Sequence, residues 1–337
     1  MSRPGPRDGG PAPYVSTGHL PPGQQVEQLV AATYHELGDV DDGEVSQVYP
    51  ALAVAPRDLF GIALVAVDGR VVTAGDADVP FTIMSVAKPF VYALVCEARG
   101  PDEARRLVGA NATGLPFNAI EAVARSSDGR TNPMVNPGAI ATSSLVPGDT
   151  ADEKWHTIIG GLSRFAGREL SLDEATYASA AATNHHNREL ARLLDGKGRL
   201  SCDPAVAVDV YTRQSCVAVS ARDLAVMGAT LADGGVNPLS GERVVQRDVC
   251  HFVLAAMITA GLYETSGDWL HDVGLPAKSG IGGGIVTVSP GKGGLGTFSP
   301  PLDAAGNSVK GQLVARLLSR RLGLDLLASA AHRARQS

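Results

Sequence analysis

The amino-acid sequence predicts an α+β protein in which an antiparallel sheet is built from both chain ends around a helical lobe. Three observations predict this arrangement. A β-hairpin pattern lies early in the chain, at residues 59–74. A mostly helical pattern runs from Ser85 to about residue 257, and a glycine-punctuated stretch with β-branched runs follows at residues 275–299. Because strand patterns flank the helices on both sides, the sheet must combine early and late segments.

The first expected elements are a helix and a hairpin. Residues 59–67 and 70–74 are β-rich runs, and Asp68-Gly69 between them is a strong hairpin signal because it tolerates the positive φ angles of a tight turn. Before them, residues 25–37 place their apolar side chains close to one helical face, namely Val26, Leu29, Val30, Ala32 and Tyr34.

The later segments follow the same reasoning. Helices are expected at, for example, residues 88–99 and 221–231, with Gly/Asn/Pro loops between them. The β-branched run at 285–288 predicts a strand, and an amphipathic pattern from about 310 to 322 predicts a closing helix.

These elements define the expected domain organisation. A Pro- and Gly-rich segment at 1–22 is expected to be a disordered tail, because it cannot bury enough apolar surface to offset its ordering entropy. One domain is expected at 23–322, followed by a C-terminal tail at 323–337. Within the domain we expect a sheet lobe at about 23–84 and 273–322, and a helical lobe at about 85–272.

Composition excludes several classes of function. The chain has 337 residues, 44% hydrophobic and 19% charged, as in a compact globular protein. Its net charge is −6, with Lys+Arg 29 against Asp+Glu 35, and no basic run or basic helix face stands out. We therefore expect no nucleic-acid partner.

Metal, export and membrane signals are also missing. The four cysteines form no C-x-x-C pair and no cluster with histidines, so no metal site is expected. The N-terminal segment lacks the apolar core of a secretory signal. The apolar run at 59–67 is about half of the roughly 20 residues that a membrane helix needs. We expect a cytoplasmic protein with no membrane partner.

One short motif could carry chemistry. Ser85 and Lys88 form an S-x-x-K pair at an expected helix start, where both side chains point from the same face. Pro89 supports this placement, because proline is tolerated in the first helical turn. By itself the motif is weak, and Lys88 could instead be a surface helix lysine. A second match, Ser289 to Lys292, falls in a Pro-Gly turn and is interpreted as structural.

Further segments strengthen the interpretation of Ser85. In chain order these are FTIMSVAK (81–88), NPMVNPGA (132–139), DVYTRQSC (209–216), GLYETSG (261–267) and GLPAKSGIGGG (274–284), followed by PGK (290–292) and DAAGNS (303–308). Together they resemble the serine-dependent glutaminases over about residues 25–322. The resemblance implies the serine β-lactamase/transpeptidase-like fold, in which Lys278-Ser279-Gly280 is similar to the K-T-G edge strand. It also implies an enzyme that needs no cofactor.

The resemblance assigns a role to each candidate site residue. Ser85 would attack a γ-carboxamide as nucleophile, and Lys88 would be its base, with a pKa lowered by burial and by Lys278. Tyr211 and Tyr263 would relay a proton and shape the site, although either could be a core tyrosine. The remaining assignments are substrate binding by Asn136 and Asn187, and an oxyanion hole formed by the backbone N–H groups of Ser85 and Ile281.

This chain departs from the family pattern in its pocket. Ala180 stands where the family has a glutamate that binds the α-ammonium of glutamine, His186 replaces an arginine, and Met84 replaces a glutamine. An ammonium without its partner would be costly to bury, so free glutamine should bind poorly.

Several substrates and activities remain open at this stage. The chain could be a slow glutaminase, or an amidase for a glutamine-like γ-glutamyl amide or hydrazide. It could also be an acyltransferase on a modified, possibly N-acylated, γ-glutamyl substrate, or a non-catalytic glutaminase-like binding protein. The family resemblance further implies a small-molecule γ-glutamyl-type partner and a homodimer or homotetramer.

Overall fold

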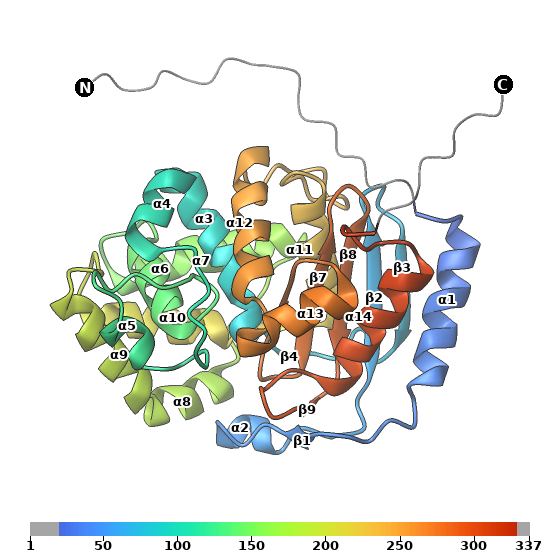
Figure 1. Cartoon of the computed structure of the whole chain (residues 1–337), viewed down its shortest axis with the longest axis horizontal. Coiled ribbons are helices and arrows are strands. Elements are labelled where there is room, and N and C mark those ends of the chain that lie inside the picture. The colour runs from blue at the N-terminus through green and yellow to red at the C-terminus, as the bar shows by residue number, and fades with distance from the viewer. Residues whose placement is uncertain (1–19, 329–337) are drawn as a thin grey trace, which may run out of the picture.

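A computed structural model describes residues 20–328 (Figure 1). Its main sheet is five-stranded and antiparallel, in the order β3-β2-β8-β7-β6. Strands β2 (Gly61–Ala66) and β3 (Val71–Gly75) come from the early part of the chain. Strands β6 (Ala277–Ser279), β7 (Gly284–Ser289) and β8 (Gly293–Phe298) come from the late part. The predicted α+β architecture is therefore confirmed.

The hairpin forms where the Asp-Gly signal predicts it. Val65 pairs with Val71, and Gly69 in the turn has a φ of 85°, in the left-handed region that favours glycine. On its other side β2 pairs with β8, with Gly61 opposite Phe298. This pairing joins the early and late segments of the chain.

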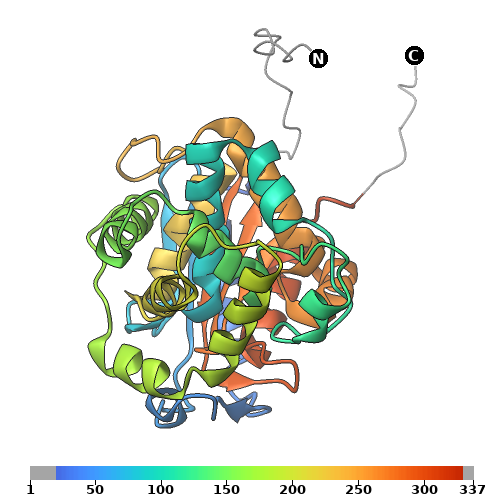
Figure 2. The same cartoon turned by 90° about the vertical axis from the view of Figure 1, so that its left-hand side faces the viewer.

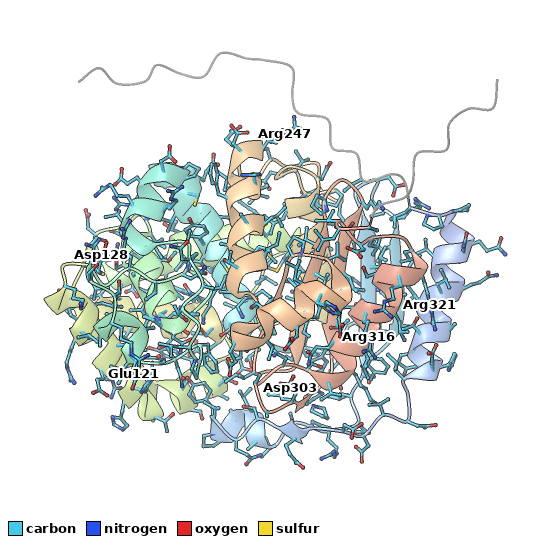
Figure 3. The ribbon with its side chains drawn as sticks, in the orientation of Figure 1. Glu121, Asp128, Arg247, Asp303, Arg316 and Arg321 are labelled. Atoms are coloured by element: carbon cyan, nitrogen blue, oxygen red, sulfur yellow. The ribbon has the colours of Figure 1, made fainter. Side chains whose placement is uncertain are left out.

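One face of the sheet is covered by helices from both chain ends. These are α1 (Gly23–Glu36), α13 (Ser266–Val273) and α14 (Val309–Arg321), seen in front of the sheet and beside it in Figure 1. Their buried side chains share one apolar cluster with β2 and β7. Arg321, labelled in Figure 3, also reaches Glu36 of α1 at 2.6 Å. Partly exposed pairs of this kind add little stability, so apolar burial holds this layer.

The opposite face is covered by α11 (Ala221–Ala232). This helix lies so close to β8 that a Cβ on Gly296 would be 2.0 Å from the Ala221 carbonyl oxygen, and a Cβ on Gly294 would be 2.3 Å from that of Ala225. Glycine at these strand positions therefore allows backbone-to-backbone packing that any side chain would prevent.

The remaining helices form a helical lobe around α3 (Ala87–Arg99), and Figure 2 shows this lobe from its outer side. Ten consecutive residues of α3, from Ala87 to Cys96, are buried. The helices around it are α4 (Pro101–Val108), α6 (Asn136–Leu145), α7 (Ala151–Ala166), α10 (Pro204–Ser215) and α12 (Arg247–Ala260). At the periphery lie α2 (Pro50–Ala53), α5 (Glu121–Ala124), α8 (Glu174–Thr183) and α9 (His185–Gly196).

Short strand pairs add contacts that the sequence patterns do not predict. Strand β4 (Phe81–Thr82) pairs with β5 (Ala218–Val219), and β1 (Glu44–Val45) pairs with β9 (Pro301–Leu302). Runs of two residues carry no readable periodicity. The β4–β5 pair ties the chain immediately before Ser85 to the end of α10.

The predicted tails fall largely outside the described residues, so the domain boundaries remain predictions. Within residues 20–328, no single helix is long and apolar enough to cross a membrane. One pair meets the criterion jointly, α12 with the segment Tyr263–Val273, but it is bent by 98°.

The contact between α11 and β8 gives a stability prediction. We expect Gly296→Ala to lower the free energy of unfolding by about 1 to 3 kcal/mol, because the new methyl group would overlap a helix carbonyl and separate the two elements. Urea unfolding measures the change. Gly160→Ala is the matched control, because a Cβ there meets nothing within 4 Å and alanine favours its helix. Equal stability of the two variants would contradict close packing.

Candidate active site

Ser85 lies where strand β4 leads into helix α3. A 3₁₀ turn, Met84–Val86, connects the two elements. Met84 has a φ of 48°, a left-handed conformation that costs a non-glycine residue about 1 to 3 kcal/mol and persists only when its surroundings enforce it. Ser85 is buried and hydrogen-bonds with the Tyr263 hydroxyl. The predicted helix-start position of the serine is confirmed.

Lys88 is one turn further along and is only 2% exposed. Its Nζ donates to Asn136 Oδ1 at 2.7 Å and to the Met134 carbonyl at 3.4 Å. Among residues 20–328, no carboxylate forms an ion pair with it. Burial lowers the pKa of Lys88 to about 7. Lys88 is therefore not a surface helix lysine, and much of it is a neutral amine near neutral pH.

Asn136 joins Lys88 to two other predicted residues. Its Oδ1 also accepts a hydrogen bond from the Tyr211 hydroxyl at 3.0 Å, and its Nδ2 donates to Asn187 Oδ1 at 3.2 Å. Burial raises the pKa of Tyr211 well above its usual value, so the phenol stays protonated and can donate. Helices α3, α6, α9 and α10 thus meet at a single carboxamide.

Tyr263 and Lys278 lie on the other side of Ser85. Tyr263, with a φ of 59°, donates to the Ser279 carbonyl at 3.2 Å, and burial raises its pKa to about 12. Lys278 Nζ lies 4.1 Å from the centre of the Tyr263 ring and donates to the Gly261 and Ser279 carbonyls. Burial, together with the charge of Lys88, lowers the pKa of Lys278 well below its usual value.

The loop between β6 and β7 brings Ile281 close to Ser85. A Cβ on Gly280 would be 3.2 Å from the Ser85 nitrogen and 3.0 Å from the Ile83 carbonyl oxygen, so the two backbones are in contact. The Ile281 amide donates to no other residue within the described part of the chain. An N–H group beside Ser85 is therefore available to a substrate oxygen.

A cavity of about 160 Å³ opens at Ser85. Among the predicted residues it is lined by Ser85, Asn136, Ala180, Asn187, Tyr211 and Ile281. Lys88 is linked to it by the hydrogen bond to Asn136, Tyr263 hydrogen-bonds with Ser85, and Lys278 lies over the Tyr263 ring. The structure therefore brings all the predicted site residues together. Its lining contains no aspartate or glutamate.

Sequence reasoning missed several lining residues, namely Tyr49, Phe117, Asn118, Asn184 and Thr212. The spacing of Asn184 and Asn187 on one helical face could have indicated Asn184. Tyr49 and Phe117 carry no such signal, because they reach the pocket from loops. Phe117 packs against the Tyr263 ring at 4.5 Å between centroids.

The departures from the family pattern all lie at this cavity. Ala180 is 1% exposed and forms part of its wall, and Met84 lines it beside Ser85. His186, at the mouth, is held by a hydrogen bond between its Nε2 and the Asn118 carbonyl.

A larger cavity of about 760 Å³ lies elsewhere, between α4 and α5. Glu121 and Asp128, on the helical side of the molecule in Figure 3, are among its lining residues. It contains none of the predicted site residues. Residues 20–328 also hold no group of three or more His, Cys, Asp or Glu side chains able to bind a metal ion.

Comparison with known proteins places the chain in a family. The Glutaminase family profile matches residues 43–327. Glutaminase 2 of Yersinia pestis is 64% identical over 316 residues, which cover 94% of this chain and 93% of the relative. The chain belongs to the glutaminase family. A glutaminase of Brucella canis is 50% identical over 284 residues, 84% of this chain and 90% of the relative.

Solved structures of glutaminases share the fold. A probable glutaminase, ybaS, aligns with a TM-score of 0.90 and 41% identity over 91% of this chain and 100% of that chain. Mglu in its glutamate form aligns with a TM-score of 0.86 and 40% identity, over 91% of this chain and 71% of that chain. This glutaminase-family hydrolase therefore has the serine β-lactamase/transpeptidase-like fold that its sequence predicts.

The burial of Lys88 predicts a pH-dependent stability. An unfolded lysine titrates near 10.4, so between about pH 7 and 10 the unfolded glutaminase binds one more proton at this site, and stability rises with pH. Lys88→Met removes this dependence. We expect the variant to be more stable than wild type at pH 6, with the difference shrinking by roughly 2 to 3 kcal/mol by pH 9. Urea unfolding at both pH values tests this; a constant difference would show that Lys88 stays protonated.

Proposed function

We propose that this protein is an amidohydrolase that cleaves the γ-carboxamide of a glutamine-like substrate through an ester on Ser85. One observation carries the proposal. Lys88 is a buried lysine that has no anionic partner among the described residues 20–328, and it lies one helical turn from a serine that lines a cavity. A neutral amine in that position can accept a proton from a serine hydroxyl.

The proposed reaction has two stages. The neutral Lys88 amine takes the Ser85 proton as Oγ attacks the amide carbon, and the Ser85 and Ile281 N–H groups stabilise the oxyanion. The C–N bond then breaks, and the nitrogen leaves as ammonia with the proton returned from Lys88 through Tyr211 or Tyr263. Water next attacks the ester, loses its proton to Lys88, and releases the γ-carboxylic acid and Ser85.

The relatives support this substrate class. Proteins that cover nearly the whole chain are named glutaminases, and the structural relative Mglu has been solved in a glutamate form. A homodimer or homotetramer, with subunits that each carry this site, is part of the proposal.

The neutral cavity adds a constraint on the α-substituent. Among residues 20–328, no aspartate or glutamate lines the cavity, and the Asp209 carboxylate on α10 is paired with Tyr177 at 2.6 Å and Arg213 at 3.0 Å. The α-ammonium of free glutamine would therefore be buried without a partner, at a cost of about 3 to 5 kcal/mol. We propose a γ-glutamyl amide or hydrazide with an acylated α-nitrogen, or a glutaryl analogue, as the better substrate.

The nucleophile can be tested directly. Incubation with a γ-glutamyl amide should release ammonia and add the acyl mass to wild-type protein, as seen by intact-mass spectrometry. Ser85→Ala should abolish both signals, because no oxygen remains to form the ester. Ser289→Ala, in the second S-x-x-K sequence, is the matched control and should behave as wild type. Turnover by the Ser85→Ala variant would refute the mechanism.

Ala180 provides the test of substrate. We expect wild-type protein to cleave an N-acylated glutamine with a higher kcat/KM than free glutamine. Ala180→Glu should shift this ratio toward free glutamine by tenfold or more, because it supplies a carboxylate for the ammonium. Ala182→Glu, exposed on the same helix, should leave the ratio unchanged. A tenfold wild-type preference for free glutamine would show that another residue supplies the anion.

A further inference from the structure

A chain of hydrogen bonds extends from Lys88 away from the reacting centre. Beyond Asn136 and Asn187, the Asn187 Nδ2 donates to Asn184 Oδ1 at 2.5 Å, and the Asn184 Nδ2 donates to Thr212 Oγ1 at 2.6 Å. Thr212 Oγ1 in turn donates to the Val208 carbonyl at 2.7 Å. We call the side chains of Asn136, Asn187, Asn184 and Thr212 the amide chain. Each of these residues is at least nine-tenths buried.

Thr212, at the end of the amide chain away from Lys88, fixes which group donates and which accepts in each of its hydrogen bonds. The Val208 carbonyl can only accept a hydrogen bond, so the Thr212 hydroxyl donates its single hydrogen to it. The Thr212 oxygen can then only accept a hydrogen bond from Asn184. Asn184 must then present its nitrogen to Thr212 and its oxygen to Asn187. Asn187 must likewise donate its nitrogen to Asn184 and accept at its oxygen from Asn136. The oxygen of Asn136 therefore faces Lys88.

The other end cannot set this direction. A neutral lysine amine and a phenol both accept as well as donate hydrogen bonds, so Lys88 and Tyr211 would tolerate either orientation of the Asn136 carboxamide. A flipped Asn136 would place an N–H group against Lys88 and Tyr211. Each buried polar group that loses its hydrogen-bond partner costs about 1 to 3 kcal/mol of free energy. The loss of one hydrogen bond in the amide chain therefore favours reorientation of the neighbouring carboxamides.

The amide chain also serves the cavity. Asn136 and Asn187 each use one N–H in the chain, which leaves each carboxamide a second N–H, and both residues line the cavity at Ser85. The orientation that holds Lys88 is therefore the orientation that offers donors to a substrate carboxylate or carbonyl.

We propose that Thr212 and Asn184 are positioning residues, which orient the Asn136 carboxamide and thereby hold Lys88 in place to accept the Ser85 proton. Neither residue needs to touch the reacting atoms. The inference rests on the proposed function, since its test uses amide cleavage as the readout.

Thr212→Val tests the proposal by removing the hydroxyl while keeping the side-chain shape. We expect kcat to fall at least tenfold and KM to rise as well, because the flipped carboxamides no longer offer the same donors to the substrate. We also expect the acidic limb of the kcat/KM profile to move to lower pH, because an N–H facing Lys88 disfavours its ammonium form. Lys278 and Tyr211, the other titratable groups facing Lys88, are unchanged in this variant. Thr212→Ser retains the hydroxyl and should restore both the rate and the pH profile.

Thr230→Val is the matched control. Thr230 is also a buried helical threonine, and it donates to the Val226 carbonyl four residues earlier at 2.9 Å and to the Phe165 carbonyl at 3.2 Å. Within the described part of the chain it accepts no hydrogen bond from an asparagine. Its kcat and pH profile should equal those of wild type. If Thr212→Val does not fold, Thr212→Ala removes the same hydroxyl and carries the comparison with Thr212→Ser.

The outcomes separate this proposal from the proposed function. Turnover by Ser85→Ala in the same assay would refute the proposed function itself. An inactive Ser85→Ala together with a Thr212→Val that matches Thr230→Val in kcat and pH profile would overturn only the role of the amide chain. A loss of rate in Thr212→Val that Thr212→Ser does not restore would also overturn it.

Discussion

The site depends on a lysine amine that is buried without an anion. Lys88 is nearly inaccessible, and its Nζ donates hydrogen bonds to the oxygens of Asn136 and Met134. A charged ammonium is poorly stabilised there, so the pKa of Lys88 falls to about 7. A carboxylate in the same position would have restored the charge and removed the base. Within residues 20–328, the helices around Lys88 supply neutral hydrogen-bond acceptors and no carboxylate, and this keeps its pKa low.

Two parts of the fold must meet for this lysine to act on Ser85. Lys88 lies on α3 and Ser85 in the 3₁₀ turn before it, whereas the amide of Ile281 comes from the loop between β6 and β7. Glycine at position 280 lets that loop approach the Ser85 backbone directly. At the face of the sheet that α11 covers, the glycines of β8 allow that helix to pack even more closely. Glycine thus allows direct backbone contact between the sheet and the helices at two places, at Gly280 and along β8.

Different parts of the cavity are proposed to carry out the reaction and to select the substrate. The groups around Ser85 that the proposed reaction requires are all present, whereas the wall at Ala180 carries no charge to pair with an α-ammonium. Under the proposed function, substitution at one wall position can change the accepted α-substituent without moving Ser85 or Lys88. Ala180 lies on α8, whereas Ser85 lies in the 3₁₀ turn before α3 and Lys88 lies on α3.

The sequence by itself determined the hairpin at Asp68-Gly69, the main helices, the late strands and the Ser85–Lys88 pair, because these follow from local periodicity and turn chemistry. Its resemblance to glutaminases also indicated Asn136, Tyr211 and Ile281. Only the tertiary structure decided that β4 pairs with β5, that Tyr49 and Phe117 reach the cavity, and that Asn184 and Thr212 continue the hydrogen bonds from Asn136. These features join residues far apart along the chain. Local sequence patterns cannot predict these contacts, because they form only when distant segments pack together. Polar side chains that become buried in this packing then form hydrogen bonds with one another.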